Sequence, residues 1–413
     1  MCIRDSLREE ETFAPTTRLK NSAKEQRRRS KRMEYAFITR KADYLRDKAV
    51  FYQYVEADYR GRLYYTESFL NYQGSDLSRG MLKFARGKPM TDDGLYWLAI
   101  HTANSFNQSY DLKEIPEWCE ADYHSYLEDE GLDSISVDKF TLNDRVRWTN
   151  ENMEVINAAG RGHIFAPDAE KPISFLACCI EWWDYNMARR DGRVYMSYLP
   201  IPIDGSNNGW QHLGAISKDI RTGRLVGLTH TDIQKDFYVQ TAKKLLEIDD
   251  PKLNTMPMKH VRKGISKRGS MTRAYSAGSK KIGENMWFDC KAEEYHELYG
   301  IDSDDCKVWA KGLIEAINEV CPGPLQTMEY LQELAAFEIG KYRRYKDGED
   351  AHEEFIEMKE RIKEITFTKE PTDSELLELN ELVLAAEGYL PTRVYGNGAT
   401  RLLWETPTGF PVE

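Results

Sequence analysis

The stretch Leu199–His212 (LPIPIDGSNNGWQH) places one carboxylate, Asp204, between an apolar run and a small polar run, Gly205 to Gly209. We expect the apolar run to be a strand and the residues from Trp210 onward to begin a helix. A carboxylate at the end of a strand can offer oxygen ligands to a hard divalent cation. Glycine beside it lets another molecule approach the backbone closely. The same residues also fit an ordinary Asp-Gly turn, so both interpretations stay open at this point.

The length and composition of the chain indicate a globular protein with more than one core. Its 413 residues exceed what one hydrophobic core supports, so we expect two or three subdomains. Hydrophobic residues make up 41% and charged residues 30% of the chain, which excludes the disordered class. The net charge of -11 argues against a protein that binds nucleic acid over its whole surface, but it is compatible with a basic cleft.

Cysteine use and hydropathy bear on the compartment. The seven cysteines include no Cys-x-x-Cys pair, and Cys178 and Cys179 lie inside an apolar run. This pattern indicates buried thiols in a reducing compartment rather than a disulfide framework or a zinc site. No apolar run approaches the roughly 20 residues that span a bilayer, so we expect no membrane partner. The opening Met1–Ser6 resembles translated adaptor sequence and the last residues stop within an apolar segment, so we expect the chain to be incomplete at both ends.

Two basic segments lie near the start of the chain. Residues 17–49 have a helical pattern, with Arg28 and Arg29 inside a basic cluster that suits either phosphate contacts or a solvated helix face. Residues 51–65 are rich in aromatic and β-branched types around Asp58-Tyr-Arg-Gly-Arg, which predicts a hairpin with its turn near glycine. Its Arg60 and Arg62 would be pre-set for phosphate or sugar contacts; the alternative is an edge-strand salt bridge with the aspartate.

The stretch Lys259–Ser276 carries basic and aromatic residues at helical spacing. Lys263, Lys267, Met271 and Tyr275 are spaced by four, so a helix would line them on one side, with Arg268 beside them. From Lys267 to Tyr275 such a helix spans about 12 Å. Cations at one end could hold a triphosphate while the ring meets the base or sugar at the other. A solvated basic helix explains the cations alone but accounts less well for the ring on the same face.

Other regions carry less chemistry. Residues 105–135 turn acidic, and we expect an irregular surface insertion there, followed by Lys139 in a Val-Asp-Lys sequence. Residues 290–390 are charged and have a mostly helical pattern in which we find no chemistry.

Four motifs in order resemble one family, the single-subunit DNA-dependent RNA polymerases of T7-like phages and mitochondria. Asp204–His212 resembles the family's motif A, and Lys263–Tyr275 resembles its motif B. Asp58–Tyr64 is similar to the family's Asp-x-Arg-Gly-Arg-x-Tyr segment, and Thr406–Val412 is similar to a Thr-Pro-x-Gly-x-Pro-Val segment of the fingers. The resemblance covers about residues 17–413, and four motifs together are far more specific than one.

The resemblance implies an α+β fold of the right-hand polymerase type, mostly helical with a small antiparallel palm sheet. The expected parts follow the chain: 1–50, a basic helical segment at the end of the thumb leading into the palm; 51–88, the first part of the palm; 89–193, a mostly helical palm insertion; 194–218, the motif A strand and turn; and 219–413, the fingers with the motif B helix, ending before motif C.

The resemblance also implies roles for the motif residues. Asp204, with the carbonyl of Gly205, would bind two Mg²⁺ ions for phosphoryl transfer. Lys267 would act catalytically on the triphosphate, and Tyr275 would end the fingers helix at the sugar and base. Related DNA polymerases carry a glutamate where this chain has Gly209, which leaves room for a 2′-hydroxyl and favours RNA synthesis.

Further candidates support these. Substrate contacts are expected from Lys263, Arg268, Lys139 and Arg62, and nucleic-acid contacts from Arg28, Arg29, Arg60, Arg62 and Tyr238, the last beside the motif B helix. The expected partners are a DNA template, nascent RNA and ribonucleoside triphosphates, for a monomer in the cytoplasm of a phage-infected bacterium or, alternatively, in a mitochondrion.

The chain departs from the family pattern at three points. Ser276 replaces a glycine, so we expect a differently shaped helix end, and Lys263 replaces an arginine, which loses bidentate phosphate contact. The family's second metal aspartate follows a histidine, and none of the eight histidines here precedes aspartate. We therefore expect a fragment that is inactive alone. The alternatives are a DNA polymerase of the same superfamily and a catalytically silent nucleic-acid-binding relative.

Overall fold

The structure, a computed structural model, divides the chain into two compact units. Unit 1 is Met1–Glu56 with Tyr64–Pro322, and unit 2 is Ala57–Leu63 with Gly323–Glu413. The residues that the structure describes are 23–58, 61–164, 166–231, 233–368, 371–387, 392–394, 400–402, 404–405 and 411–412. Arg60 and most of the Thr406–Val412 motif lie outside them.

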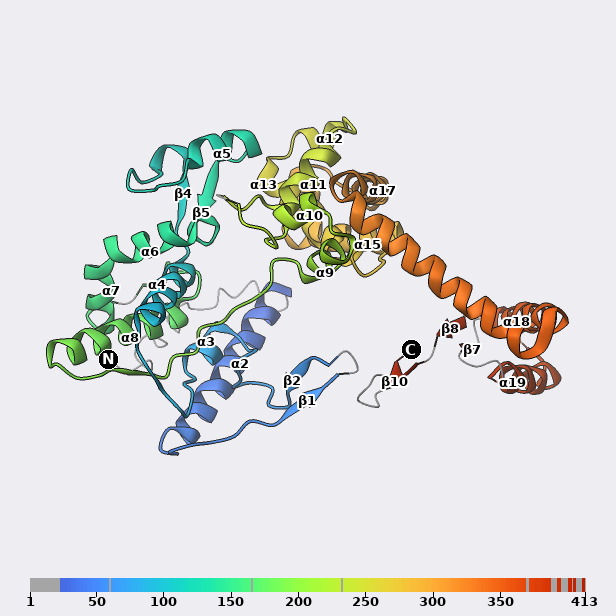
Figure 1. The fold of residues 1–413 in the computed structure, drawn as a ribbon, viewed down its shortest axis with the longest axis horizontal. Coiled ribbons are helices and arrows are strands. Elements are labelled where there is room, and N and C mark those ends of the chain that lie inside the picture. The colour runs from blue at the N-terminus through green and yellow to red at the C-terminus, as the bar shows by residue number, and fades with distance from the viewer. Residues whose placement is uncertain are drawn as a thin grey trace. The chain divides into compact units, whose positions relative to one another are not determined.

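The described residues are mostly helical, as Figure 1 shows. The first half of unit 1 contains the helices α2 (Ala23–Leu45), α3 (Asp76–Gly80), α4 (Asp92–Phe106), α5 (Tyr123–Glu130), α6 (Leu142–Glu151), α7 (Met153–Gly160) and α8 (Pro172–Arg190), with the short turns η2 (Leu112–Glu114) and η3 (Val137–Lys139). Its second half contains α9 (Asn208–Ser217), α10 (Ile220–Leu225), α11 (Phe237–Leu246), α12 (Pro251–Asn254), α13 (Met258–His260), the π-helical turn η4 (Val261–Ser266), α14 (Lys267–Arg273), α15 (Ser279–Ala292), α16 (Tyr295–Leu298) and α17 (Ser303–Val320). Unit 2 contains most of α18 (Pro322–Phe367), and α19 (Asp373–Glu387).

The described strands are short and form two-stranded sheets. Their pairs are β1 (Val55–Ala57) with β2 (Leu63–Tyr65), β3 (Lys88–Pro89) with β6 (Met196–Ser197), β4 (Ser109–Asp111) with β5 (Ser134–Ser136), β7 (Thr392–Val394) with β8 (Thr400–Leu402), and β9 (Trp404–Glu405) with β10 (Pro411–Val412). The last four pairs are antiparallel, and Lys88 lies opposite Ser197 in the pair nearest to the motif A stretch. The expected mixture of many helices and small antiparallel sheets is therefore confirmed at this coarse level.

The prediction that a strand leads directly into Asp204 is wrong. β6 ends at Ser197, and the residues from there to Asp204 form no strand. Pro200 and Pro202 explain the difference, because proline has no N–H to donate to a neighbouring strand.

The first half of unit 1 packs around a core of large side chains. Trp148, Phe140, Phe175 and Leu98 are each at most 2% exposed and belong to one cluster that joins α4, α6 and α8. The prediction of an irregular surface insertion at residues 105–135 is wrong. This segment forms β4, η2, α5 and β5, and its Tyr123 is buried in the same core.

The second half of unit 1 is a helical bundle that holds the two sequence motifs. Leu245, Ile265, Ile282 and Trp309 are each at most 1% exposed and come from α11, η4, α15 and α17. An Asp302 capping box fixes the start of α17. The motif B stretch is thus held on the inside by apolar packing, and its polar side chains are left for other partners.

A buried carboxylate ties α5 to the start of this bundle. Glu130, which is 0% exposed, lies 3.6 Å from Lys235 and 3.7 Å from Lys243 in α11. Lys243 also donates to the carbonyl of Asp129 at 2.6 Å. Breaking such a buried pair leaves an uncompensated charge, so this contact holds the end of α5 against α11.

In unit 2, α18 and α19 are joined by a forked ion pair. Arg361 donates to the two oxygens of Glu378 at 2.8 and 3.0 Å. The helical pattern predicted for residues 290–390 is confirmed for the described part of that range. None of the described helices is long and apolar enough to cross a membrane. The described cysteines are all free, and Cys178 and Cys179 are fully buried as predicted.

Candidate functional site

The Asp204 carboxylate lies exposed in the loop before α9. Its Oδ1 accepts a hydrogen bond from the N–H of Gly205 at 2.8 Å. The carbonyl of Gly205 accepts from the N–H of Asn207 at 3.1 Å, and Asn207 takes a left-handed φ of 72°. A Cβ at Gly205 would lie 3.0 Å from Oε1 of Gln211, the far end of a flexible side chain. The helix predicted to begin near Trp210 is confirmed, because α9 starts at Asn208.

Helix α9 packs directly against α14. The indole N–H of Trp210 donates to the carbonyl of Ser270 at 2.8 Å, and Trp210 is 1% exposed. The hydroxyl of Tyr275 donates to Oδ1 of Asn208 at 2.6 Å. The structure therefore brings Tyr275, just beyond α14, to the start of the helix that follows Asp204.

The space that a Cβ would take at Gly209 is filled by residues that follow α14. A Cβ there would lie 2.7 Å from Cβ of Ala274 and 3.2 Å from the ring of Tyr275. The room expected at this position is thus occupied by the aromatic ring in the structure. Ser276, next in the chain, has a φ of 64°, the conformation glycine favours, so the backbone keeps a glycine-type shape there.

We expect Gly209→Ala to lower the free energy of unfolding by about 1–3 kcal/mol, because the added methyl overpacks a contact formed by Ala274, whose Cβ cannot move without its backbone. Urea unfolding measures this. The matched control is Gly223→Ala in α10, where the nearest atom would be at 3.5 Å. That variant should be neutral or more stable by up to about 1 kcal/mol, since alanine restricts the unfolded chain. Equal stability of the two variants would contradict the packing at Gly209.

A π-helical turn changes how the motif B cations are presented. The N–H of Lys267 bonds to the carbonyl of Arg262, five residues earlier, so residues five apart share a face in η4. Lys263 and Arg268 are such a pair, and they bind Glu293 at 2.5 Å and Asp289 at 2.9 Å, both from α15. The prediction that Lys263 lies in one line with Lys267 is therefore wrong, because the sequence spacing assumed an α-helix throughout.

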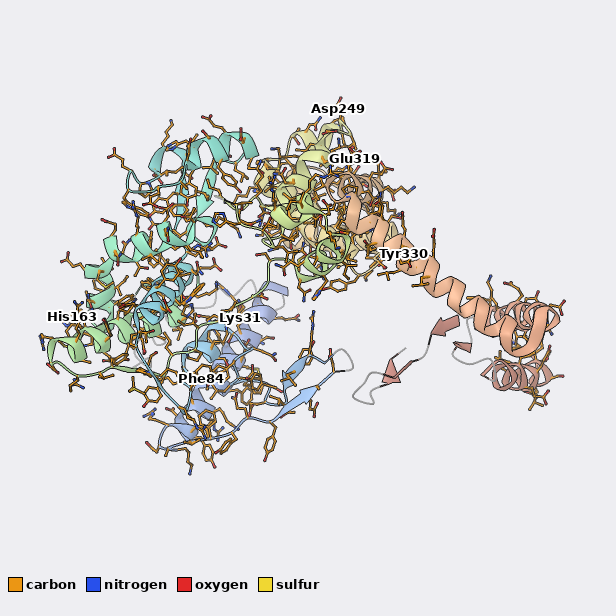
Figure 2. All side chains as sticks on the ribbon, viewed as in Figure 1. Lys31, Phe84, His163, Asp249, Glu319 and Tyr330 are labelled. Carbon is orange, nitrogen blue, oxygen red and sulfur yellow. The ribbon has the colours of Figure 1, made fainter. Side chains whose placement is uncertain are left out.

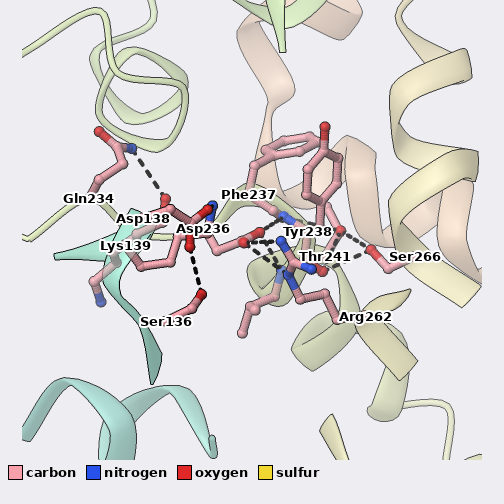
Figure 3. Close-up of polar contacts among 12 residues, drawn as sticks. Ser136, Asp138, Lys139, Gln234, Asp236, Phe237, Tyr238, Thr241, Arg262 and Ser266 are labelled. Carbon is pink, nitrogen blue, oxygen red and sulfur yellow. Dashed lines mark hydrogen bonds and ion pairs between the residues drawn. The ribbon is translucent and has the colours of Figure 1, made fainter. Parts of the chain in front are cut away.

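The second pair on this turn, Arg262 and Lys267, is directed to α11 and η3. Arg262 donates to Oδ2 of Asp236 at 2.9 and 2.6 Å. The other oxygen of Asp236 accepts from the N–H groups of Tyr238 and Val239, which caps α11. Figure 3 shows Asp236 and Arg262 facing each other. One carboxylate thus joins the start of α11 to the π-turn.

Lys139 comes to the same place from the insertion. Lys139 lies 3.2 Å from Asp138, both are labelled in Figure 3, and the charges of both act on Lys267. Burial would raise the pKa of Asp138, but the charge of Lys139 and the hydrogen bond from Ser136 outweigh it, so the pKa is lowered and the group stays ionised. The structure therefore brings together Lys139 and the motif B stretch, which are far apart in sequence.

Arg262, Lys139 and Lys267 form a cluster of cations, and of the three only Lys267 has no carboxylate partner among the described residues. Burial, then the charges of Arg262 and Lys139, lower its pKa, and Asp236 and Asp138 oppose them. Among the described residues Lys267 forms no ion pair, whereas Arg262 and Lys139 each have one. An ammonium beside two other cations gains from an anionic ligand, which restores the charge balance.

Tyr238 lies beside the motif B stretch, as expected. Its carbonyl accepts from the hydroxyl of Ser266 at 2.8 Å, and Arg262 lies 5.7 Å from its ring centre. Burial, with the charge of Asp236 and against that of Arg262, raises the pKa of Tyr238 to about 12, so its hydroxyl stays protonated. The contact is structural, and a nucleic-acid role for Tyr238 stays a prediction.

The remaining predicted residues lie on other elements. Arg28 and Arg29 are exposed on α2. Arg62 belongs to the hairpin turn, where its N–H donates to the carboxylate of Asp58 at 2.8 Å and Gly61 has a φ of 77°. The hairpin and its turn are confirmed, and their functional role stays a prediction.

The oxygen donors at Asp204 suit a metal ion whose remaining ligands come from substrate phosphates. No group of three or more His, Cys, Asp or Glu side chains that could hold a metal occurs among the described residues. Asp204 and the Gly205 carbonyl offer oxygens of the type that Mg²⁺ prefers. Mg²⁺ in nucleotide sites keeps waters and binds one or two carboxylates together with substrate phosphates. The residues present therefore fit part of such a shell.

Arg262 and Asp236 were missed by sequence reasoning. Asp236 could have been found as a helix cap before Phe237, since aspartate favours that position. Arg262 could not have been found, because its direction depends on the π-turn.

Comparison with known proteins places these features in context. A family model described as DNA-dependent RNA polymerase matches residues 88–413. T7 RNA polymerase of Escherichia phage T7 is 31% identical over 229 residues, 54% of this chain and 22% of that protein. The mitochondrial DNA-directed RNA polymerase 1 of Arabidopsis thaliana is 31% identical over 227 residues, 54% of this chain and 20% of that protein. A probable DNA-directed RNA polymerase of Neurospora crassa is 30% identical over 265 residues, 62% of this chain and 26% of that protein. The matched part is thus about a fifth to a quarter of the length of these relatives.

Proposed function

The chain belongs to the DNA-dependent RNA polymerase family, and from this premise we propose that it contributes the nucleotide site for DNA-templated RNA synthesis. The observation that supports this is the position of α14. It begins at Lys267, in the cationic cluster, and leads to Tyr275, which bonds to Asn208 close to Asp204. About 12 Å separates the two ends of this stretch at helical rise, the reach of a triphosphate with its sugar.

The proposed roles follow from the contacts. Lys267 and Lys139 hold the phosphates, and Arg262 adds positive charge while Asp236 fixes its position. Asp204 and the Gly205 carbonyl would hold Mg²⁺, two ions being expected. The bound metal would supply positive charge to stabilise the negative charge of the phosphates during transfer.

Lys263 and Arg268 are secondary phosphate ligands. Their side chains are 53% and 47% exposed, and exposed ion pairs with Glu293 and Asp289 contribute little. A triphosphate can therefore compete for both cations at small cost.

At the other end of α14, the hydroxyl of Tyr275 exchanges its bond with Asn208 for one to the sugar. The ring lies over Gly209, so an incoming ribose must meet it. This arrangement makes Tyr275 the residue that meets the sugar.

The right-hand architecture is proposed on the same basis. Residues 51–88 and 194–218 form the palm, 89–193 its insertion, and 219–413 the fingers, with 1–50 leading in from the thumb. DNA template, nascent RNA and ribonucleoside triphosphates are the proposed partners of the whole monomeric polymerase. Relatives from a phage and from mitochondria leave both an infected bacterium and a mitochondrion as its location.

Triphosphate binding tests the proposal. We expect this chain to bind ATP in isothermal titration calorimetry, and Lys267→Ala to weaken binding about tenfold or more, because a charge-assisted hydrogen bond contributes about 1.5–3 kcal/mol. The control is Lys311→Ala, an exposed lysine of α17 outside the cluster.

Three outcomes would contradict the proposal. Equal loss in the two lysine variants would remove the role of Lys267. Tighter binding of dATP than ATP would favour a DNA polymerase. Nucleic-acid binding without any triphosphate binding would favour the silent relative.

A further inference from the structure

Two carboxylates bind cations of motif B in the structure. Asp289 lies in the last turn of α15, and Glu293 directly follows this helix. Nη1 of Arg268 donates to Oδ1 of Asp289 at 2.9 Å, and Nζ of Lys263 donates to Oε2 of Glu293 at 2.5 Å. The two cations that we assign to the phosphates as secondary ligands are therefore already bound to anions of the chain itself.

Close packing keeps the carboxylates beside these cations. A Cβ at Gly269 in α14 would lie 2.9 Å from the side chain of Ile282 in α15. A Cβ at Gly264 in η4 would lie 2.8 Å from the ring of Tyr295, which begins α16 just after Glu293. Glycine at both positions lets the segments approach each other closely. An exchange of ion pairs here therefore requires only the rotation of side chains.

Both ion pairs are of a kind that can be given up easily. Burial raises the pKa of Asp289, the charge and hydrogen bond of Arg268 offset this in part, and the charge of Glu293 adds to it. The pair with Arg268 therefore does not fully compensate the desolvation of its carboxylate. Lys263 is exposed to water, which screens its pair with Glu293. The two carboxylates thus fix the direction of the cations at little gain in stability.

We propose that Asp289 and Glu293 are positioning residues that compete with the triphosphate for Arg268 and Lys263. In the empty site they hold both cations toward α15. A bound triphosphate takes the cations over, and the carboxylates take them back when pyrophosphate leaves. They thus lower the affinity of the site for phosphates and favour the release of pyrophosphate. This inference rests on the proposed function, because it assigns the two cations to the nucleotide.

Isothermal titration calorimetry of the 413-residue chain with ATP, and separately with pyrophosphate, tests this. We expect Asp289→Asn and Glu293→Gln each to bind both ligands about fivefold more tightly, because that change matches the interaction of unit charges about 4 Å apart in water. The double variant should gain about tenfold or more, since neighbouring changes need not add fully. A residue that only supports the structure would lose affinity when replaced, so a gain in affinity identifies competition.

Two matched controls separate competition from the change in net charge. Glu294→Gln removes a carboxylate next to Glu293 that forms no ion pair among the described residues. Glu319→Gln removes a carboxylate at the end of α17 that lies 2.7 Å from Lys244, outside motif B; Figure 2 labels Glu319. Both controls should change the affinity by less than about twofold, because exposed charges without a direct contact are screened. Thermal unfolding confirms that all variants stay folded.

Two results overturn this inference alone. Equal gains in Glu293→Gln and Glu294→Gln would mean that net charge sets the affinity, and unchanged or weaker binding by Asp289→Asn and Glu293→Gln would mean that the carboxylates do not compete. In both cases, weaker ATP binding by Lys267→Ala would leave the proposed function in place. Absence of ATP binding in the unaltered chain and in every variant would refute both.

Discussion

Replacement of Asp204 by alanine is expected to lower RNA extension by about a thousandfold or more, since metal-assisted charge stabilisation contributes several kcal/mol to phosphoryl transfer. The carboxylate is exposed, and its hydrogen bond to Gly205 is local, so the variant should keep the stability of the unaltered protein. Templated extension by a polymerase that carries this segment together with a second metal aspartate measures the first effect, and thermal unfolding of this chain measures the second.

Two comparisons make this test specific. Asp93→Ala removes an exposed carboxylate from the first turn of α4 and should leave extension unchanged. Mn²⁺ paramagnetic resonance with ATP and this chain should show fewer bound ions for Asp204→Ala. RNA synthesis by the Asp204 variant at the normal rate would refute the metal role, and synthesis by this chain alone would refute the expectation that it is inactive in isolation.

The sequence predicted the local start of α9 because glycine, asparagine and a following apolar pattern are short-range signals. It also predicted the hairpin at Gly61, where positive φ favours glycine. It did not predict that β6 stops at Ser197, since the length of a strand depends on its partner, and β3 offers only Lys88 and Pro89 for pairing.

The sequence named Lys139, Lys267 and Tyr275 as candidate site residues, but it did not name Arg262 or Asp236 and did not predict how these residues lie. Lys139 was predicted from the resemblance, and Lys267 from its helical spacing and the resemblance. Their proximity could not be predicted, because it depends on the packing of the insertion against α11, where the buried Glu130 lies 3.7 Å from Lys243. One extra residue in a helical turn redirects the side chains that precede it. In the π-turn it directs Lys263 toward α15 and Arg262 toward Asp236. Periodicity in the sequence assumes one repeat and cannot show this.

Trp210→Ala is expected to produce the largest loss of stability, about 3–5 kcal/mol, because it removes a fully buried ring. It also leaves the carbonyl of Ser270 without its bond from the indole. Urea unfolding measures the loss, and Trp97→Ala, at a ring that is 43% exposed on α4, is the control and should cost much less.

Trp210→Phe separates the two contributions of this residue, since it keeps most of the apolar contact and loses only the N–H. We expect it to cost about 1–3 kcal/mol and to weaken ATP binding as well, because the bond to Ser270 holds α9, and with it the loop of Asp204, against α14. If Trp210→Phe lost stability but bound ATP as the unaltered chain does, the seam between α9 and α14 would be a packing contact alone, and the alignment of Asp204 with Lys267 and Tyr275 would have to come from elsewhere in the bundle.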